Sequence, residues 1–140
     1  MKKIVMFVYG TIATDARVQR AAACLARNFE VILLSVRGKS QVAVGDGKYS
    51  NIFIDCGFQR KEFKLFSFLS KCFELIKREK PDIVYAHDYY STLLAYFLLR
   101  QRKRPKLIYD AHELIIPNAH YNIGRRLKFF GWFEKRIVNK

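Results

Sequence analysis

Three titratable side chains, Asp110, His112 and Glu113, stand within four residues of one another directly after the short apolar run 107–108. This order indicates a strand that opens into a loop, and open α/β sheets bind their ligands just past the carboxyl ends of strands. A histidine in such a loop can hydrogen-bond a substrate hydroxyl and, when protonated, offset negative charge that develops on a leaving group. We therefore predict a catalytic role for His112, with a purely structural loop histidine as the alternative.

Asp110 and Glu113 each have two open roles. Either carboxylate could fix the tautomer of His112 by accepting a hydrogen bond from one ring nitrogen, or it could cap the loop. Neither is assigned as a general base, because that role requires a carboxylate within hydrogen-bond reach of an acceptor hydroxyl, which sequence spacing does not specify. Both remain candidate substrate-binding residues beside His112.

Two further groups of candidate binding residues follow other predicted strands. Gly10 and Thr11 come directly after the first apolar run, and His87 and Asp88 come directly after the fourth. Because the carboxyl ends of parallel strands lie at the same edge of a sheet, we expect the loops that carry Gly10, His87 and His112 to meet there.

Alternating strand and helix patterns must position these loops. Strands are predicted at residues 3–9, 30–36, 51–55, 82–86 and 106–109, and helices at 15–29, 63–79, 89–104 and from about 122 to 140, the first with Asp15 as its N-cap. This alternation predicts one α/β domain over residues 1–140, with a Rossmann-like, doubly wound and mostly parallel sheet and helices on both faces. The first strand is expected between the second and the fourth.

Composition narrows the class of protein. Hydrophobic residues make up 51% of the 140 residues, which indicates a folded globular domain. No apolar run approaches the roughly 20 residues that a membrane span requires, and the apolar run at the amino terminus is too short for a signal peptide. We therefore expect a cytoplasmic protein. The formal net charge of +14 indicates an anionic partner such as a phosphorylated substrate, an acidic membrane surface or nucleic acid.

The three cysteines and the end of the chain each give an expectation. Cys24, Cys56 and Cys72 lack the spacing of metal ligands, and we predict that they are buried thiols in a reducing compartment. The last predicted helix has neither a glycine cap nor a proline stop before Lys140. We therefore expect the chain to be truncated or a fragment of a longer protein.

Taken together, the motifs resemble the start of a family 4 glycosyltransferase of the GT-B architecture. The resemblance covers nearly the whole chain and depends on the order and spacing of several short motifs. These are the basic strand at 2–9, the sequence DARVQR at 15–20, PDIVYAHD at 81–88, YDAHEL at 109–114 and WFEK at 132–135.

The resemblance implies an amino-terminal, acceptor-side domain facing a carboxy-terminal nucleotide-sugar domain that this chain lacks. Such enzymes move a sugar to an acceptor hydroxyl, usually with retention and without a metal or other cofactor. Gly10 and Thr11 then match the loop near the donor phosphates and acceptor, His87 the acceptor side, and His112 the donor sugar near the reacting centre. The chain alone is expected to be inactive.

Two features bear on these implied roles. The first loop carries Gly10-Thr11 where many family members have two glycines, which weakens the expectation of close backbone approach to phosphate. His87, Asp88, His112 and Glu113 include metal-ligating residue types, but the resemblance argues against a metal site.

The implied partners are a nucleotide-sugar donor, a sugar or lipid-linked acceptor for polysaccharide or glycolipid synthesis in bacteria, and the inner face of the cell membrane. Arg17, with Arg20, could face a phosphate-bearing acceptor, or both could lie on a solvated helix face. A basic and aromatic cluster in the last helix could lie on an anionic membrane or fill a core or domain interface: Arg125, Arg126, Lys128, Phe129, Phe130 and Trp132.

The alternative class is a basic α/β module that binds nucleic acid or a membrane surface without catalysis. Nucleic acid is disfavoured because the basic residues are scattered and no helix-turn-helix, zinc-finger or RNA-recognition signature is present. A dinucleotide-binding Rossmann domain is disfavoured because the first loop lacks the pattern Gly-x-Gly-x-x-Gly.

Overall fold

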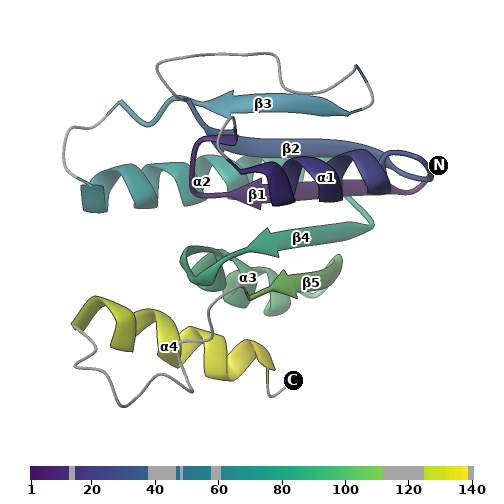
Figure 1. Cartoon of the computed structure of the whole chain (residues 1–140). Coiled ribbons are helices and arrows are strands. Elements are labelled where there is room, and N and C mark those ends of the chain that lie inside the picture. Colours follow the sequence, from purple (N-terminus) through teal and green to yellow (C-terminus); the bar gives the residue numbers. More distant parts are fainter. Residues whose placement is uncertain (13–14, 38–46, 48, 58–60, 112–124, 139–140) are drawn as a thin grey trace.

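In the computed structural model, a single sheet of five parallel strands carries helices on both of its faces (Figure 1). The structure describes residues 1–12, 15–37, 47, 49–57, 61–111 and 125–138. His112 and Glu113, and the start of the last predicted helix, lie outside these described residues. The predicted class, a Rossmann-like α/β fold, is confirmed.

The strands occur in the spatial order β3-β2-β1-β4-β5. Their bounds are Lys3–Val8 for β1, Glu30–Val36 for β2, Ser50–Ile54 for β3, Ile83–His87 for β4 and Lys106–Asp110 for β5. The predicted central position of the first strand is confirmed, because β1 pairs with both β2 and β4. The strand order therefore reverses between β1 and β4, and ligands of open α/β sheets bind at such a point.

The helices are α1 (Ala16–Leu25), α2 (Lys61–Glu79), α3 (Thr92–Leu99) and α4 (Arg125–Val138), with a 3₁₀ turn, η2 (Tyr89–Ser91), before α3. The prediction of one helix over 89–104 was wrong at both ends, since it begins as η2 and stops at Leu99. Residues 100–104 hold four basic side chains and no apolar one, so a longer helix would gain like-charge repulsion without burying any surface.

Each face of the sheet has its own core. Val5 and Phe7 of β1 pack with residues of α2, α3 and α4, whereas Ile4 and Met6 of the same strand pack with residues of α1. Figure 1 shows α1 and α2 on opposite sides of the strands. Burial on both faces explains why β1 is a continuous apolar run and does not alternate with polar residues.

The cysteine prediction is correct for two of the three residues. Cys56 and Cys72 are buried, and burial raises the pKa of both thiols, that of Cys72 most. Cys24 is exposed, contrary to the prediction. It stands two residues after the buried Ala22 in α1, and two residues turn a helix by more than half a revolution, so Cys24 faces away from the sheet.

Candidate functional site

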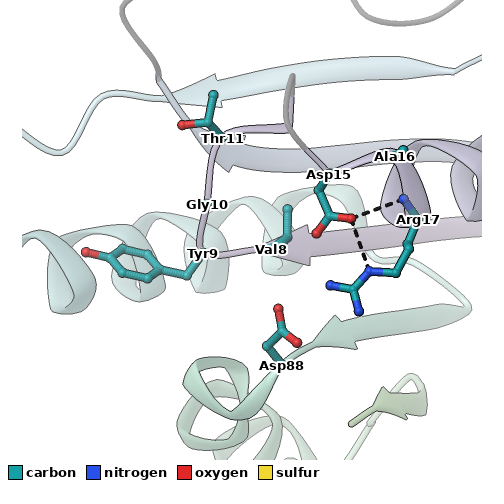
Figure 2. Close-up of a pocket in the computed structure, with 8 residues that line it drawn as sticks. All are labelled: Val8, Tyr9, Gly10, Thr11, Asp15, Ala16, Arg17 and Asp88. Atoms are coloured by element: carbon teal, nitrogen blue, oxygen red, sulfur yellow. Dashed lines mark hydrogen bonds and ion pairs between the residues drawn. The ribbon is translucent and has the colours of Figure 1, made fainter. Parts of the chain in front are cut away.

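A pocket with a volume of about 390 Å³ opens at the carboxyl ends of β1 and β4, where the strand order reverses (Figure 2). This volume lies within the roughly 300–1,000 Å³ typical of small-molecule sites. Eight residues line it: Val8, Tyr9, Gly10, Thr11, Asp15, Ala16, Arg17 and Asp88. The expected meeting of the loops after β1 and β4 is therefore present in the structure.

The loop after β1 is held by its own backbone and leaves open space beside Gly10. The Gly10 amide donates to the carbonyl of Val8 at 3.0 Å, and the Gly10 carbonyl accepts from the amide of Val36 on β2 at 3.2 Å. A Cβ atom added at Gly10 would meet nothing within 4 Å. A ligand can therefore approach the Gly10 backbone closely, and a side chain at this position would occupy that space.

The start of α1 contributes two charged side chains to the pocket. Asp15 Oδ1 caps the helix by accepting from the amides of Arg17 and Val18 at 3.1 and 3.2 Å, which confirms the predicted N-cap. The same oxygen lies 3.6 Å from Arg17 Nε, and the Arg17 side chain is 56% exposed. The sequence indicated Asp15 as a cap but not as a pocket residue. Asp15 has both roles, because the amino-terminal end of α1 that it caps lies at the pocket.

Asp88 has a backbone conformation that is rare for any residue except glycine. Its φ is 60° and its ψ is 166°, a region that costs on the order of 1–3 kcal/mol and persists only where the surroundings fix it. Three hydrogen bonds do so here: the Asp88 amide donates to the carbonyl of Asp110, and the Asp88 carbonyl accepts from both the amide and the hydroxyl of Ser91. Such outliers concentrate at functional sites.

Figure 2 shows the Asp15 and Asp88 carboxylates and the Arg17 guanidinium directed toward the same space, while the Tyr9 ring points away from them. Two carboxylates and one guanidinium offer acceptors and donors to a ligand that carries several hydroxyls. The pocket thus combines an open backbone at Gly10 with polar side chains from α1 and from the end of β4.

His87 and Asp110 meet beside this pocket, at the ends of β4 and β5. The two residues are register partners, and His87 Nδ1 lies 3.3 Å from Asp110 Oδ2. Tyr85 donates to the same carboxylate oxygen at 3.2 Å and stacks on His87 with a centroid distance of 4.5 Å. Burial, followed by the negative charge of Asp110, raises the pKa of Tyr85, which keeps its hydroxyl a donor.

His87 is only 1% exposed, so it does not reach open solvent as a surface ligand would. Its neighbour Asp88 lines the pocket, and the Asp88 amide bonds to Asp110. Asp110 therefore supports the pocket residue Asp88 through its carbonyl, and His87 contacts the Asp110 side chain from a buried position. Tyr85 was not singled out in the sequence, although its spacing of two from His87 puts both side chains on the same face of β4.

A buried carboxylate fixes α4 to β5. Glu134 is fully buried, and the Tyr109 hydroxyl donates to its Oε1 at 2.8 Å. Burial and then this hydrogen bond raise the pKa of Tyr109 well above its usual value. The contact links the strand that leads to His112 with the helix that follows it.

Among the residues that the structure describes, no group of three or more histidine, cysteine, aspartate or glutamate side chains is arranged to hold a metal ion. Within the same residues, no helix is both long and apolar enough to cross a membrane.

Comparison with known protein sequences gives two findings. The model of the family described as Glycosyltransferase Family 4 matches residues 16–140, which is most of the chain. No curated protein matches the sequence.

Solved structures match the fold. The chain is similar to a sucrose-phosphate synthase from Thermosynechococcus elongatus with a TM-score of 0.72 and 13% identity, over 100% of this chain and 41% of that one. A second structure described as this enzyme from the same organism matches with a TM-score of 0.58 and 13% identity, over 80% of this chain and 64% of that one. The chain thus spans less than two thirds of these structures, and the likeness at this identity concerns the fold alone.

Proposed function

Because the chain belongs to glycosyltransferase family 4, we propose that it is the acceptor-side domain of an enzyme that transfers a sugar from a nucleotide-sugar to an acceptor hydroxyl. The observation that supports this most is the pocket where the strand order reverses, lined by Gly10, Thr11, Arg17 and Asp88. Its position and its size suit a sugar, and its carboxylates suit the recognition of hydroxyls.

Each pocket residue has a proposed task. The Asp88 and Asp15 carboxylates accept hydrogen bonds from acceptor hydroxyls, and Arg17 donates to a hydroxyl or to a phosphate of the acceptor. Gly10 and Thr11 let the ligand approach the backbone without meeting a large side chain. Asp110 is a positioning residue, because its carbonyl on the next strand accepts from the Asp88 amide, and His87 lies 3.3 Å from the Asp110 carboxylate.

The transfer step itself is assigned to His112, with Glu113 and Asp110 as its supports. A histidine at the donor sugar can hydrogen-bond a sugar hydroxyl and, when protonated, offset charge on the departing nucleotide phosphate. We propose that transfer proceeds with retention and without a bound metal or cofactor, and that a second domain holds the nucleotide-sugar. This chain alone would then turn over little or no substrate.

The proposed acceptor is a precursor of a bacterial polysaccharide or glycolipid, and the proposed location is the cytoplasm at the inner face of the cell membrane. The net charge of +14 supports this, because such a charge favours an anionic surface or an anionic acceptor.

The test is a transfer assay with the full-length enzyme and a panel of radiolabelled nucleotide-sugars, measuring label on the acceptor. Asp88→Asn is expected to raise KM for the acceptor about tenfold, since it removes one charged acceptor from the pocket. Asp82→Asn is the matched control, because Asp82 lies at the opposite end of the sheet and accepts from the Lys3 amide, a bond that an asparagine oxygen also makes. The absence of transfer from every nucleotide-sugar in the panel would contradict the proposal. Salt-sensitive binding to a random oligonucleotide, without sugar transfer, would also contradict it.

A further inference from the structure

One surface of the molecule combines exposed aromatic rings with arginines. We call it the α3–α4 patch, and it consists of Tyr96, Phe97, Arg100, Phe129, Trp132 and Arg136. Phe97 is 52% exposed, and Phe129 and Trp132 are each 46% exposed. In α4 the last three residues stand at positions i, i+3 and i+7, which is one stripe along a helix. Helices α3 and α4 pack side by side, so the two sets of side chains share a surface.

Tyr96 holds the patch together from its centre. Its ring centroid lies 5.7 Å from those of both Phe97 and Trp132, and 5.2 Å from that of the buried Phe133. Arg100 donates to the Tyr96 hydroxyl at 3.0 Å. The exposed rings therefore stand on a buried aromatic base and keep their positions without a ligand.

The exposed charges that the structure describes between residues 92 and 138 have a single sign. Between residues 92 and 138, the described part of the chain has two acidic side chains: Glu134 is fully buried, and Asp110 ends β5. The exposed charged residues described over the same span are all basic: Arg100, Arg102, Lys103, Arg104, Lys106, Lys128, Lys135 and Arg136. Over this span, exposed aromatic rings occur with exposed cations alone, and this combination is complementary to an anionic layer with an apolar interior.

We propose that the α3–α4 patch binds the surface of a bilayer that contains anionic phospholipids. Phe97, Phe129 and Trp132 enter the boundary between headgroups and acyl chains, and the arginines contact lipid phosphates. The inference rests on the membrane location proposed above and deepens it by assigning the surface, the lipid class and the orientation of the domain.

Nucleic acid fits the same patch less well. Binding of single strands relies on open aromatic faces on which bases stack. The guanidinium of Arg136 lies 3.3 Å from the centroid of the Trp132 ring and covers one of its faces. The Trp132 ring also contacts Phe133 at a centroid distance of 4.7 Å and an interplanar angle of 81°.

The patch is connected to the pocket through a row of aromatic side chains. Phe130 of α4 lies 5.8 Å from Tyr89 and 5.6 Å from Tyr90, which follow Asp88 directly. Tyr90 in turn lies 5.3 Å from Tyr9 at the pocket. The Phe129 end of the patch therefore lies toward the end of the sheet that carries the pocket, and an acceptor with a lipid anchor can reach the pocket from that side.

The experiment uses the only tryptophan of the chain, Trp132. The protein is titrated with vesicles of phosphatidylcholine alone and with vesicles that contain about 30% phosphatidylglycerol, and binding is measured by sedimentation. Quenching of Trp132 fluorescence by brominated acyl chains reports insertion of the ring. Wild-type protein is expected to bind the anionic vesicles at least about tenfold more tightly than the neutral ones and to be quenched in them.

Two double variants separate the aromatic and the electrostatic contributions. Phe97→Ser with Phe129→Ser keeps Trp132 as the reporter, and Arg100→Gln with Arg136→Gln removes two charges. Each is expected to weaken binding to anionic vesicles by about tenfold. The matched controls are Ile108→Ser, which is 41% exposed on β5, and Lys2→Gln with Arg27→Gln, which removes two exposed charges away from the patch. Circular dichroism checks that every variant is folded.

Equal binding to neutral and anionic vesicles would overturn the proposal, and so would variants of the α3–α4 patch that bind like their controls. Binding to a random oligonucleotide without binding to vesicles would assign the patch to nucleic acid instead. Transfer to a soluble acceptor, measured in parallel with the full-length enzyme, keeps the proposed catalytic function separate from membrane binding. If the wild-type protein binds anionic vesicles but transfers no sugar to the soluble acceptor, only the catalytic proposal is contradicted.

Discussion

The two ends of the sheet both collect charged side chains, but they arrange them differently. At the amino end, Lys3 Nζ lies 3.1 Å from Glu79 and 3.3 Å from Glu30, and the Lys3 amide bonds to the Asp82 carboxylate at 2.8 Å. These side chains bond to one another or to the backbone. At the carboxyl end, Asp15, Arg17 and Asp88 surround a pocket. The kind of residue present therefore does not distinguish a site from a structural network, whereas the space that the residues enclose does.

Backbone geometry gives the same contrast. Among the described residues, each end of the sheet has one non-glycine residue with positive φ, Lys80 at 46° and Asp88 at 60°. Lys80 closes α2, and its amide bonds to the carbonyl of Ile76, which is a common way to end a helix. Asp88 ends no helix but lines the pocket. Lys80 thus has a positive φ that serves to end a helix, whereas Asp88 has a positive φ at a residue that lines the pocket.

The strongest test of the contrast is the variant His112→Ala in the full-length enzyme. If the carboxyl end is the reacting side, kcat should fall about a hundredfold, because a group that stabilises transition-state charge is lost. KM for the acceptor should change little, since His112 is assigned to the donor sugar. His120→Ala is the matched control, because His120 has no motif around it in the sequence. Wild-type turnover in His112→Ala would remove this residue from the site.

A smaller effect is expected from Gly10→Ala at the same end of the sheet. The added methyl group meets no protein atom within 4 Å, so the melting temperature should stay close to that of the wild type. KM for the acceptor should rise about tenfold, because the methyl group takes space where the ligand approaches the backbone. Gly57→Ala gives the opposite result: φ there is +61°, so it should cost about 1 kcal/mol of stability without changing KM. An unchanged KM in Gly10→Ala would show that the ligand binds elsewhere.

The strain at the two ends can be compared with Asp88→Gly and Lys80→Gly. Glycine relieves positive φ at both positions, and each variant should gain on the order of 1 kcal/mol in the free energy of unfolding. Only Asp88→Gly should lose activity, because only Asp88 supplies a carboxylate to the pocket. Urea unfolding and the transfer assay measure the two quantities. Full activity in a stabilised Asp88→Gly variant would mean that the strain has no functional purpose.

The smallest effect is expected from Lys3→Gln at the amino end. Hydrogen bonding to Lys3 lowers the pKa of Glu79 from 4.5, so the contribution of the pair to stability is present above that pH and is lost as the pH falls below it. Hydrogen bonding to Glu79 raises the pKa of Lys3 from 10.5, so the contribution is also lost as the pH rises beyond that value.

Lys3→Gln should therefore lower the melting temperature slightly between these two pH values, and the difference from wild type should vanish in acid and shrink in high salt. Turnover should be unchanged. A loss of activity without a loss of stability would contradict the structural assignment of the amino end.

Much of the fold followed from the sequence, because hydrophobic periodicity and caps are local signals. The central position of β1 and the cap at Asp15 were predicted correctly for this reason. The end of α3 was placed too late, since basic residues at 100–104 were read as a favourable helix end although they have no apolar neighbour to pack on the sheet. The exposed Cys24 was missed because cysteine was treated as buried without regard to helix phase.

The site was predictable only in part. The loops that carry Gly10 with Thr11 and Asp88 meet in one pocket, as expected from strand order. Arg17 lines the same pocket, whereas the sequence left open whether it faces a ligand or solvent. Asp15 was missed there because its capping role already explained it.

Contacts between strands that are distant in sequence were also missed. The bond from Tyr85 to Asp110 depends on the register of β4 and β5, and the bond from Tyr109 to Glu134 depends on how α4 packs. Neither quantity is fixed by local sequence.

The central claim is that ligand binds between the carboxyl ends of β1 and β4. Hydrogen–deuterium exchange of the full-length enzyme, with and without saturating nucleotide-sugar and acceptor, tests it most directly. We predict that ligand slows exchange at residues 9–11 and 88–91 and leaves residues 2–4 and 80–82 unchanged. Protection confined to the amino end of the sheet, or no change at 9–11 and 88–91 under turnover conditions, would contradict the account.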